Sequence, residues 1–328
     1  MKVAIVGCGL IGAKRAACIP ANSIAWLIDK NIATAKALSA KYPSARTGSA
    51  WSEAVSDPSV QAVFISTSHD SLAEIAEASI ENGKHVLLEK PGAVSAFALK
   101  KVVDISLKRK DIVVKIGFNH RFHPAFLKAK EIVKTGEIGP LMFIRGRYGH
   151  GGRIGYEKEW RAQKAISGGG ELIDQGMHLI DLSRWFLGDF TAIDGYCPTY
   201  FWNMNVEDNA FLSLKTEAGQ MAWLHAGWTE WKNVFSFEIF GRNGKLQIDG
   251  LGGSYGTEKL TYFKMLPQMG PPETTTWEFP FPDKSWELEV EDFFRAIQGR
   301  HKPTGDLHDG FAALQIVEKI YSKQSRAG

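Results

Sequence analysis

Short apolar runs alternate with segments of helical periodicity through the first 120 residues. The runs consist mostly of Val, Ile, Leu, Phe and Ala, and they lie at 2–6, 24–28, 62–66, 85–89 and 113–118. Unbroken runs of this length are typical of parallel strands that are buried on both faces. The intervening segments carry apolar residues at helical spacing, and they lie at 13–19, 32–41, 71–82 and 95–109. This alternation predicts an α/β fold with a doubly wound parallel sheet.

The pattern changes after residue 122. Helices are expected at 124–135, 171–187, 286–298 and 307–322. The expected strands, several of them joined by turn residues, lie at 141–147, 192–200, 209–216, 221–228, 235–240, 244–249 and 259–263. Apolar and less apolar positions alternate within 210–215, which indicates a sheet with one covered and one open face. The second half is therefore predicted to be an α+β domain with an open, mostly antiparallel sheet.

The chain length of 328 residues favours two domains, which we place at 1–122 and 123–328. We expect that the C-terminal helix can pack against the first domain. Hydrophobic residues make up 44% of the chain and the net charge is only +3, which argues against nucleic-acid and membrane-surface partners. The three cysteines have no paired spacing, so we expect a cytoplasmic protein with neither disulfides nor a cysteine metal site.

The first apolar run leads into Gly7-Cys8-Gly9-Leu10-Ile11-Gly12, which matches G-x-G-x-x-G between a strand and a helix. In a Rossmann dinucleotide-binding domain, the first glycine makes a tight turn, the second admits a pyrophosphate, and the third lets helix and strand pack closely. Asp29 ends the next predicted strand, where an acid binds the adenosine ribose. Because its carboxylate would repel a 2′-phosphate, NAD is favoured over NADP, although Lys30 moderates this preference.

Two further groups could carry chemistry. Glu89-Lys90-Pro91 ends the run at 85–89, at the sheet edge where open α/β folds bind ligands, and Lys90–Pro91 is a candidate for a cis bond. Asp174 and His178 are four residues apart and would share a helical face, which suits an acid/base pair, although Asp181 could orient His178 as well. The glycines at 168–170 would let backbone approach a ligand at the start of that helix. No metal site is expected, because His178 has no second ligand at suitable spacing.

Together, GCGLIG, Glu89-Lys90-Pro91, Asn119-His120-Arg121, Trp160-Arg161 and the Asp174/His178 pair occur in the order that resembles the glucose–fructose oxidoreductase/inositol dehydrogenase (Gfo/Idh/MocA) family. The resemblance covers essentially the whole chain. It implies a Rossmann domain that binds NAD or NADP, followed by an open-sheet domain that contacts substrate and forms homodimers or homotetramers. The segment 67–72 departs from the family pattern, with His69 in the place of an asparagine and Leu72 in that of a histidine.

The resemblance and the motifs assign catalytic roles to Lys90, Asp174 and His178. The expected cofactor contacts are Gly7, Gly9, Leu10, Ile11, Gly12, Asp29, Lys30, Ser66, Thr67, His69, Glu89, Lys90, Asn119, Arg121, Trp160 and Arg161. The expected substrate contacts are Lys90, Arg147, Arg153, Asp174 and His178.

The function predicted from these residues is NAD-dependent oxidation of a secondary hydroxyl of a sugar. Six cations against two acids at 145–164 favour a nucleotide sugar, such as UDP-N-acetylglucosamine oxidised at its 3-hydroxyl. A free sugar or myo-inositol is the alternative substrate, and an NAD-dependent glycosidase or a non-catalytic cofactor-binding regulator is the alternative of another class. Large side chains such as Trp223 and Phe237 are expected on the open sheet face, where another subunit would cover them.

Overall fold

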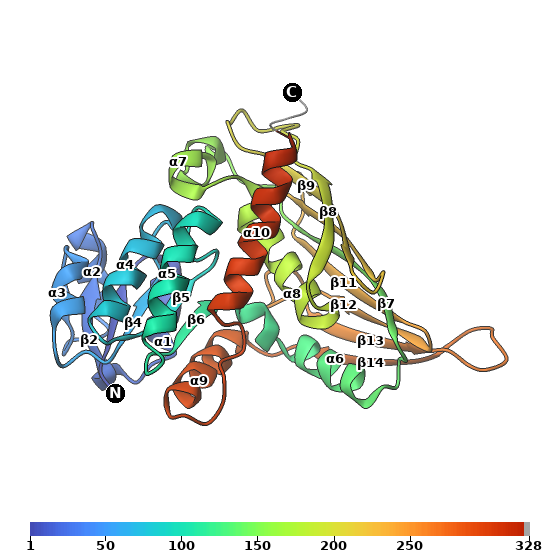
Figure 1. Cartoon of the computed structure of the whole chain (residues 1–328), viewed down its shortest axis with the longest axis horizontal. Helices are drawn as coiled ribbons and strands as arrows, with labels where there is room; N and C mark the ends of the chain where they lie inside the picture. Colours follow the sequence, from blue (N-terminus) through green and yellow to red (C-terminus); the bar gives the residue numbers. More distant parts are fainter. Residues whose placement is uncertain (325–328) are drawn as a thin grey trace. The chain divides into compact units, whose positions relative to one another are not determined.

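The computed structural model describes residues 1–324 and divides into two compact units, which are described separately (Figure 1). The first unit comprises Met1–Phe118, Ala165–Gly168 and Trp286–Phe311, and the second comprises the remaining segments. The first continuous segment of the first unit ends at Phe118, four residues before the expected boundary, and the unit also includes most of helix α9. No helix within residues 1–324 is long and apolar enough to cross a bilayer.

The first unit is a parallel sheet with strand order β3-β2-β1-β4-β5-β6, which confirms the doubly wound fold. Its strands are β1 (Val3–Val6), β2 (Ile24–Ile28), β3 (Arg46–Gly48), β4 (Ala62–Ile65), β5 (His85–Glu89) and β6 (Val114–Gly117). Its helices are α1 (Leu10–Ala17), α2 (Ile32–Ser39), α3 (Trp51–Ser56), α4 (His69–Glu81), α5 (Ala96–Lys108) and α9 (Ser285–Ile297), with a 3₁₀ turn at Ala21–Ser23. The short elements β3 and α3 were not expected, since neither carries an apolar run.

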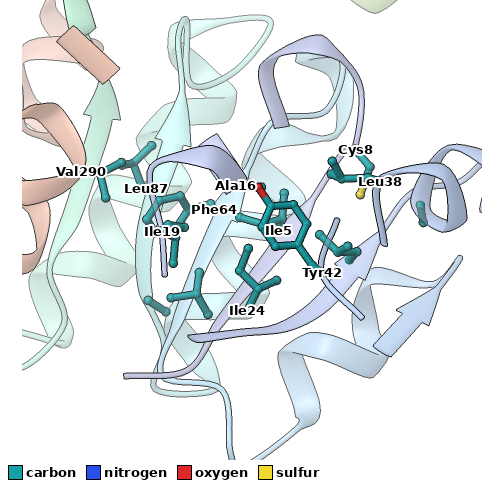
Figure 2. Packing of buried hydrophobic residues seen from close by; sticks show 14 of the residues in the cluster. Ile5, Cys8, Ala16, Ile19, Ile24, Leu38, Tyr42, Phe64, Leu87 and Val290 are labelled. Atoms are coloured by element: carbon teal, nitrogen blue, oxygen red, sulfur yellow. The ribbon is translucent and has the colours of Figure 1, made fainter. Parts of the chain in front are cut away.

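Buried aliphatic and aromatic side chains fill the space beside this sheet (Figure 2). One cluster of buried side chains contains Ile5 and Phe64 from the central strands together with Val290 and Phe293 from α9. The Phe64 and Phe293 rings meet edge to face, with their centroids 5.6 Å apart. Helix α9 therefore contributes to the core of the first unit, although it lies far from the central strands in the sequence.

The sheet of the second unit has strand order β14-β13-β12-β11-β7-β10-β9-β8, and all neighbours are antiparallel except the parallel pair β7 and β10. Its strands are β7 (Leu141–Gly149), β8 (Phe190–Tyr196), β9 (Asn209–Thr216), β10 (Met221–Gly227), β11 (Val234–Gly241), β12 (Gly244–Asp249), β13 (Glu258–Lys264) and β14 (Glu273–Phe279). The helical segments are Asn119–Phe122, α6 (Pro124–Thr135), Tyr156–Lys158, Trp160–Ala162, a π-helix at Leu172–Gly176 and α8 (Met177–Leu187). Helices α7 (Lys164–Ser167) and α10 (Leu307–Gln324) each contribute residues to both units.

Helices α6 and α8 cover one face of this sheet (Figure 1). Phe237 of β11 contacts Phe126 of α6 and Phe186 of α8 on that face, so its predicted place on the open face is wrong. Phe237 lies opposite Gly146 in the register, whereas Trp223 lies opposite Arg145 and is 59% exposed on the other face. The predicted alternation in β9 is confirmed, because its even-numbered residues from 210 to 214 are buried, whereas Phe211 and Ser213 are partly exposed and Lys215 is exposed.

Candidate functional site

The loop between β1 and α1 has the geometry that the glycine motif predicts. Gly7 adopts a left-handed φ of 91°, and a Cβ there would lie 2.4 Å from the Ser66 carbonyl oxygen. A Cβ on Gly12 would lie 1.8 Å from the Gly7 carbonyl oxygen, so only glycine lets helix and strand approach this closely. A Cβ on Gly9 would meet no atom of the described chain within 4 Å. The backbone at Gly9 is therefore open to a ligand, and the loop fits a dinucleotide pyrophosphate.

Asp29 follows β2 beside this loop. Its carboxylate accepts hydrogen bonds from the backbone N–H of Cys8 at 2.8 Å and of Asn31 at 2.9 Å. Burial and the neighbouring Asp29 charge raise the pKa of the Cys8 thiol to about 12, so the thiol stays protonated at neutral pH. Asp29 thus fixes the glycine loop and places negative charge next to it, which suits a hydroxyl-bearing ribose and disfavours a 2′-phosphate.

Other predicted residues of the first unit follow the neighbouring strands at the same edge of the sheet. Ser66 and Thr67 follow β4, and the Ser66 N–H donates to the Val6 carbonyl. His69 begins α4 and its Nδ1 lies 2.7 Å from the Ser167 carbonyl oxygen. Because parallel strands bring their carboxyl ends together, the loops after β1, β4 and β5 meet at this edge, beside the point where the strand order reverses.

Lys90 directly follows β5 and is half-buried, and the bond to Pro91 is cis, as expected. Below it, Glu89 accepts from the Arg15 guanidinium of α1, whose Nε lies 2.7 Å from the carboxylate. Arg15 is fully buried and also contacts Glu289 of α9 at 2.6 Å. This ionic cluster joins the glycine-loop helix to the strand end that carries Lys90. The sequence did not predict this cluster, because its charged residues lie far apart along the chain.

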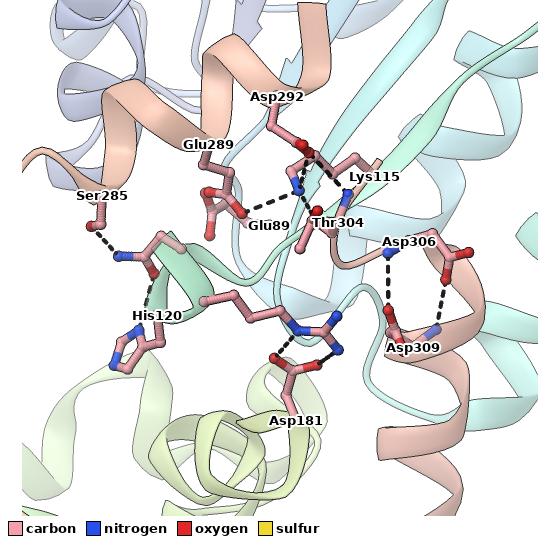
Figure 3. Close-up of polar contacts among 12 residues, drawn as sticks. Glu89, Lys115, His120, Asp181, Ser285, Glu289, Asp292, Thr304, Asp306 and Asp309 are labelled. Atoms are coloured by element: carbon pink, nitrogen blue, oxygen red, sulfur yellow. Dashed lines mark hydrogen bonds and ion pairs between the residues drawn. The ribbon is translucent and has the colours of Figure 1, made fainter. Parts of the chain in front are cut away.

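The ionic cluster continues along α9 through Lys115 of β6 (Figure 3). Lys115 Nζ lies 3.1 Å from Asp292, and it donates to the Thr304 carbonyl oxygen. A Cβ on Gly117 would lie 2.8 Å from the Arg15 guanidinium, so glycine at this position leaves room for the pair with Glu89. The buried charges are thus matched by opposite charges at each step, as burial of ions requires.

Asp174 and His178 lie in the second unit, but the helix predicted at 171–187 is two helices. Leu172–Gly176 is a π-helix, and α8 begins at Met177, so the spacing of one continuous α-helix does not hold between them. The Asp174 carboxylate accepts from Arg161 Nε at 3.0 Å, and the Arg161 guanidinium also lies over the Trp160 ring. His178 is buried with 5% of its surface exposed.

The glycines before this helix have a structural role that differs from the expected one. Cβ atoms on Gly169 and Gly170 would lie 2.1 Å from the Tyr321 hydroxyl and 2.0 Å from the Glu207 carbonyl oxygen. The Glu207 side chain accepts from the N–H groups of Gly170 and Leu172 and from the Tyr321 hydroxyl. Burial raises the pKa of Glu207. These glycines therefore let the start of the π-helix pack against Glu207 and Tyr321.

Asn119 and Arg121, both expected near the cofactor, are buried in the second unit. Asn119 Nδ2 donates to the Ser285 hydroxyl at 3.0 Å, and its Oδ1 lies 3.2 Å from His120 Nδ1 (Figure 3). The Arg121 guanidinium donates to both carboxylate oxygens of Asp181, at 2.9 and 2.6 Å. The Arg121–Asp181 pair anchors the Asn119–Phe122 turn to α8, and this explains the presence of Asp181 three residues after His178.

The basic segment at 145–164 carries less available positive charge than its composition predicts. Three of its arginines contact carboxylates, in the pairs Arg145–Glu238 at 2.5 Å, Arg153–Glu159 at 2.7 Å and Arg161–Asp174 at 3.0 Å. Arg147 lines a pocket of about 620 Å³ at the ends of β7 and β11, together with Glu230, Asn233, Ser254 and Tyr255. Lys232 lines the same pocket. Arg147 pairs with His225 in the register and shares the open face of the sheet with it, whereas α8, which carries His178, covers the other face.

Comparison with known protein families shows to which family this chain belongs. Residues 1–118 match the oxidoreductase family with an NAD-binding Rossmann fold, and residues 126–247 match the GFO/IDH/MocA C-terminal domain. The chain belongs to the Gfo/Idh/MocA family. Both halves of the expected architecture are thereby confirmed, and the Gfo/Idh/MocA assignment accounts for the open glycine loop of the first unit.

Members of the Gfo/Idh/MocA family with assigned activities include sugar and polyol dehydrogenases. Levoglucosan dehydrogenase of Pseudarthrobacter phenanthrenivorans is 34% identical over 171 residues, which span 52% of this chain and 44% of that enzyme. Inositol 2-dehydrogenase of Salmonella typhimurium is 28% identical over 333 residues, which span 99% of this chain and 94% of that enzyme. The solved structure of levoglucosan dehydrogenase with NADH and levoglucosan has a TM-score of 0.88, with 23% identity over 99% of this chain and 97% of that one, and so shares the fold.

Proposed function

We propose that this protein is an NAD-dependent dehydrogenase that oxidises a secondary hydroxyl of a free sugar or polyol. The observation that carries the proposal is the loop at Gly7–Gly12, whose open backbone at Gly9 and adjacent Asp29 carboxylate suit NAD, in a chain of an oxidoreductase family. NAD, when bound, accepts the hydride. We infer that Gly7, Gly9, Gly12 and Asp29 would hold it.

The residues proposed to act on the substrate have chemistry that matches the reaction. His178 would take the hydroxyl proton, since a neutral imidazole is a suitable base near neutral pH. Lys90 would donate a hydrogen bond to the reacting oxygen and stabilise negative charge on it. Asp174, held by Arg161, would set the tautomer of the His178 imidazole. That Lys90, Asp174 and His178 act together in one reaction is itself part of the proposal.

Free sugars and polyols are favoured over nucleotide sugars on two grounds. The arginines at 145, 153 and 161, half of the cations that favour a phosphate-bearing substrate, contact carboxylates. The relatives named above act on levoglucosan or inositol. A nucleotide sugar is the second candidate, and it would require a cationic site such as the pocket that Arg147 and Lys232 line.

The test is a substrate panel with NAD, in which NADH absorbance and product are measured together. The panel contains myo-inositol, levoglucosan, glucose, N-acetylglucosamine, UDP-N-acetylglucosamine and an aryl glycoside. NADH formation with a neutral sugar or polyol supports the proposal. A strong preference for UDP-N-acetylglucosamine would select the second candidate. Released aglycone without net NADH would identify a glycosidase, and NAD binding without any turnover would favour a regulator.

We further propose that the protein forms a homo-oligomer through the open face of the second sheet. Trp223 is 59% exposed there, and Phe143 and Phe240 stack with ring centroids 4.1 Å apart. Exposed apolar faces of this kind are commonly covered by another subunit. Light scattering at micromolar concentration should give a dimeric or tetrameric mass, and Trp223→Glu should lower it. A monomeric mass for the unmodified chain would contradict this proposal.

A further inference from the structure

The proposed base His178 lies directly against a second histidine. The imidazole rings of His120 and His178 are stacked, with ring centroids 3.7 Å apart and an interplanar angle of 16°. Both rings are buried, with exposed fractions of 6% and 5%. At this distance the two ring faces are in van der Waals contact, so any tilt of the His178 ring toward His120 is blocked.

Hydrogen bonds on both ring nitrogens hold His120 in place. Its Nδ1 lies 3.2 Å from Asn119 Oδ1 (Figure 3). Its Nε2 lies 3.3 Å from the Tyr148 hydroxyl oxygen. Asn119 is in turn bound by the Ser285 hydroxyl. We assign the proton of His120 to Nδ1, because the Asn119 amide oxygen can only accept, and the Tyr148 hydroxyl near Nε2 also bonds Tyr255.

The surroundings keep this arrangement rigid. Burial raises the pKa of the Tyr148 phenol well above its usual range, so Tyr148 remains a donor. The His123 ring also meets His120 edge to face, with centroids 5.6 Å apart, and His123 contacts Glu258 at 2.9 Å. His120 is therefore supported by hydrogen bonds at its edge and by rings around it.

We propose that His120 is a positioning residue that fixes the ring plane of His178 for proton transfer. The proposal rests on the assignment of His178 as the base. A base must present its lone pair to the hydroxyl within a narrow range of angle and distance, and small misplacements of a reacting group lower turnover strongly. A fixed imidazole face achieves this without occupying either nitrogen of His178.

The test compares His120→Ala with His120→Phe, using a neutral substrate that the unmodified protein turns over. His120→Ala should lower kcat roughly 10- to 100-fold while KM and NAD affinity change less than about twofold, because only the proton-transfer geometry is lost. His120→Phe keeps a planar ring against His178 and should restore most of kcat. His225→Ala is the matched control, because His225 stacks on Phe211 at 4.4 Å on the open sheet face, away from α8.

Failure of this inference is distinguishable from failure of the proposed function. If the unmodified protein oxidises no sugar, the proposed function fails. If it does and His120→Ala keeps its kcat, or loses it only together with NAD affinity and thermal stability, the positioning role is overturned. Proton NMR gives a readout independent of activity: the His178 Cε1–H resonance should move in His120→Ala, because the ring current of His120 is removed, and should stay in His225→Ala. An unchanged resonance in His120→Ala would overturn the stacking itself.

Discussion

Gly9→Ala separates the role of the glycine loop in folding from its role in binding NAD. Gly9 has φ −68° and ψ −161°, a conformation that alanine adopts freely, and its Cβ would contact no described atom within 4 Å. Replacing glycine at such a position stabilises a protein by about 0.4–1 kcal/mol. The melting temperature of the unliganded variant should therefore rise by roughly 1–4 °C.

The same methyl group would occupy the space through which a pyrophosphate approaches the Gly9 backbone. Loss of one hydrogen bond to a charged group costs about 1.5–3 kcal/mol, which is roughly a 10- to 140-fold loss of affinity. Calorimetric titration with NAD measures this loss, and thermal denaturation without NAD measures the stability. Normal NAD affinity in Gly9→Ala would refute the assignment of this loop as the pyrophosphate site.

Gly12→Ala is the matched comparison within the same loop. Its Cβ would lie 1.8 Å from the Gly7 carbonyl oxygen, so strand and helix must separate by more than about 1 Å. Overpacking of this kind costs about 1–3 kcal/mol or more, so this variant should lose both stability and NAD affinity. An unchanged melting temperature of Gly12→Ala would contradict this reasoning, because it would show that the loop accommodates the added methyl group.

Cofactor choice, core electrostatics and acid stability provide further tests. Asp29→Ala should narrow the ratio of NAD to NADP affinity in calorimetry, and equal affinities in the unmodified protein would refute this. Arg15→Met should lower the free energy of unfolding in urea by about 3–5 kcal/mol, because two buried glutamates lose their cation; a loss under about 1 kcal/mol would refute it. Hydrogen bonds from Ser59 and Trp26 lower the pKa of Asp57 from 3.8 to about 2. The ionised Asp57 carboxylate therefore stabilises the fold above pH 3.8, and this contribution is lost as the pH falls toward 2. The free energies of unfolding of Asp57→Asn and of the unmodified chain should therefore differ less at the lower pH.

The parts of the fold that sequence predicts are those whose burial leaves a local pattern. Strands β1, β2 and β4 are unbroken apolar runs and β5 has an apolar centre, and all four lie within a residue of their predicted bounds. Strand β14, by contrast, reads Glu-Thr-Thr-Thr-Trp-Glu-Phe and lies at the sheet edge, largely exposed. Because most of its residues are polar or exposed, no apolar alternation marks it.

The features of the site likewise divide into those that the sequence predicts and those that only the structure shows. The glycines at 7, 9 and 12 act on neighbours close in sequence, and their roles follow from the motif. Arg15 and Glu89 are 74 residues apart, and each alone reads as an ordinary surface charge. His120 and His178 lie on different elements, and only the packing of the Asn119–Phe122 turn on α8 brings their rings together. Contacts of this kind depend on tertiary structure, which periodicity does not encode.

The most direct test of the proposed reaction is steady-state oxidation of a neutral sugar or polyol by Lys90→Met and His178→Ala, with NAD affinity measured in parallel. Because both side chains are proposed to act on the reacting hydroxyl, kcat should fall by roughly 10²–10⁴ while NAD affinity stays nearly unchanged. Near-normal turnover at substrate saturation in either variant would contradict the account.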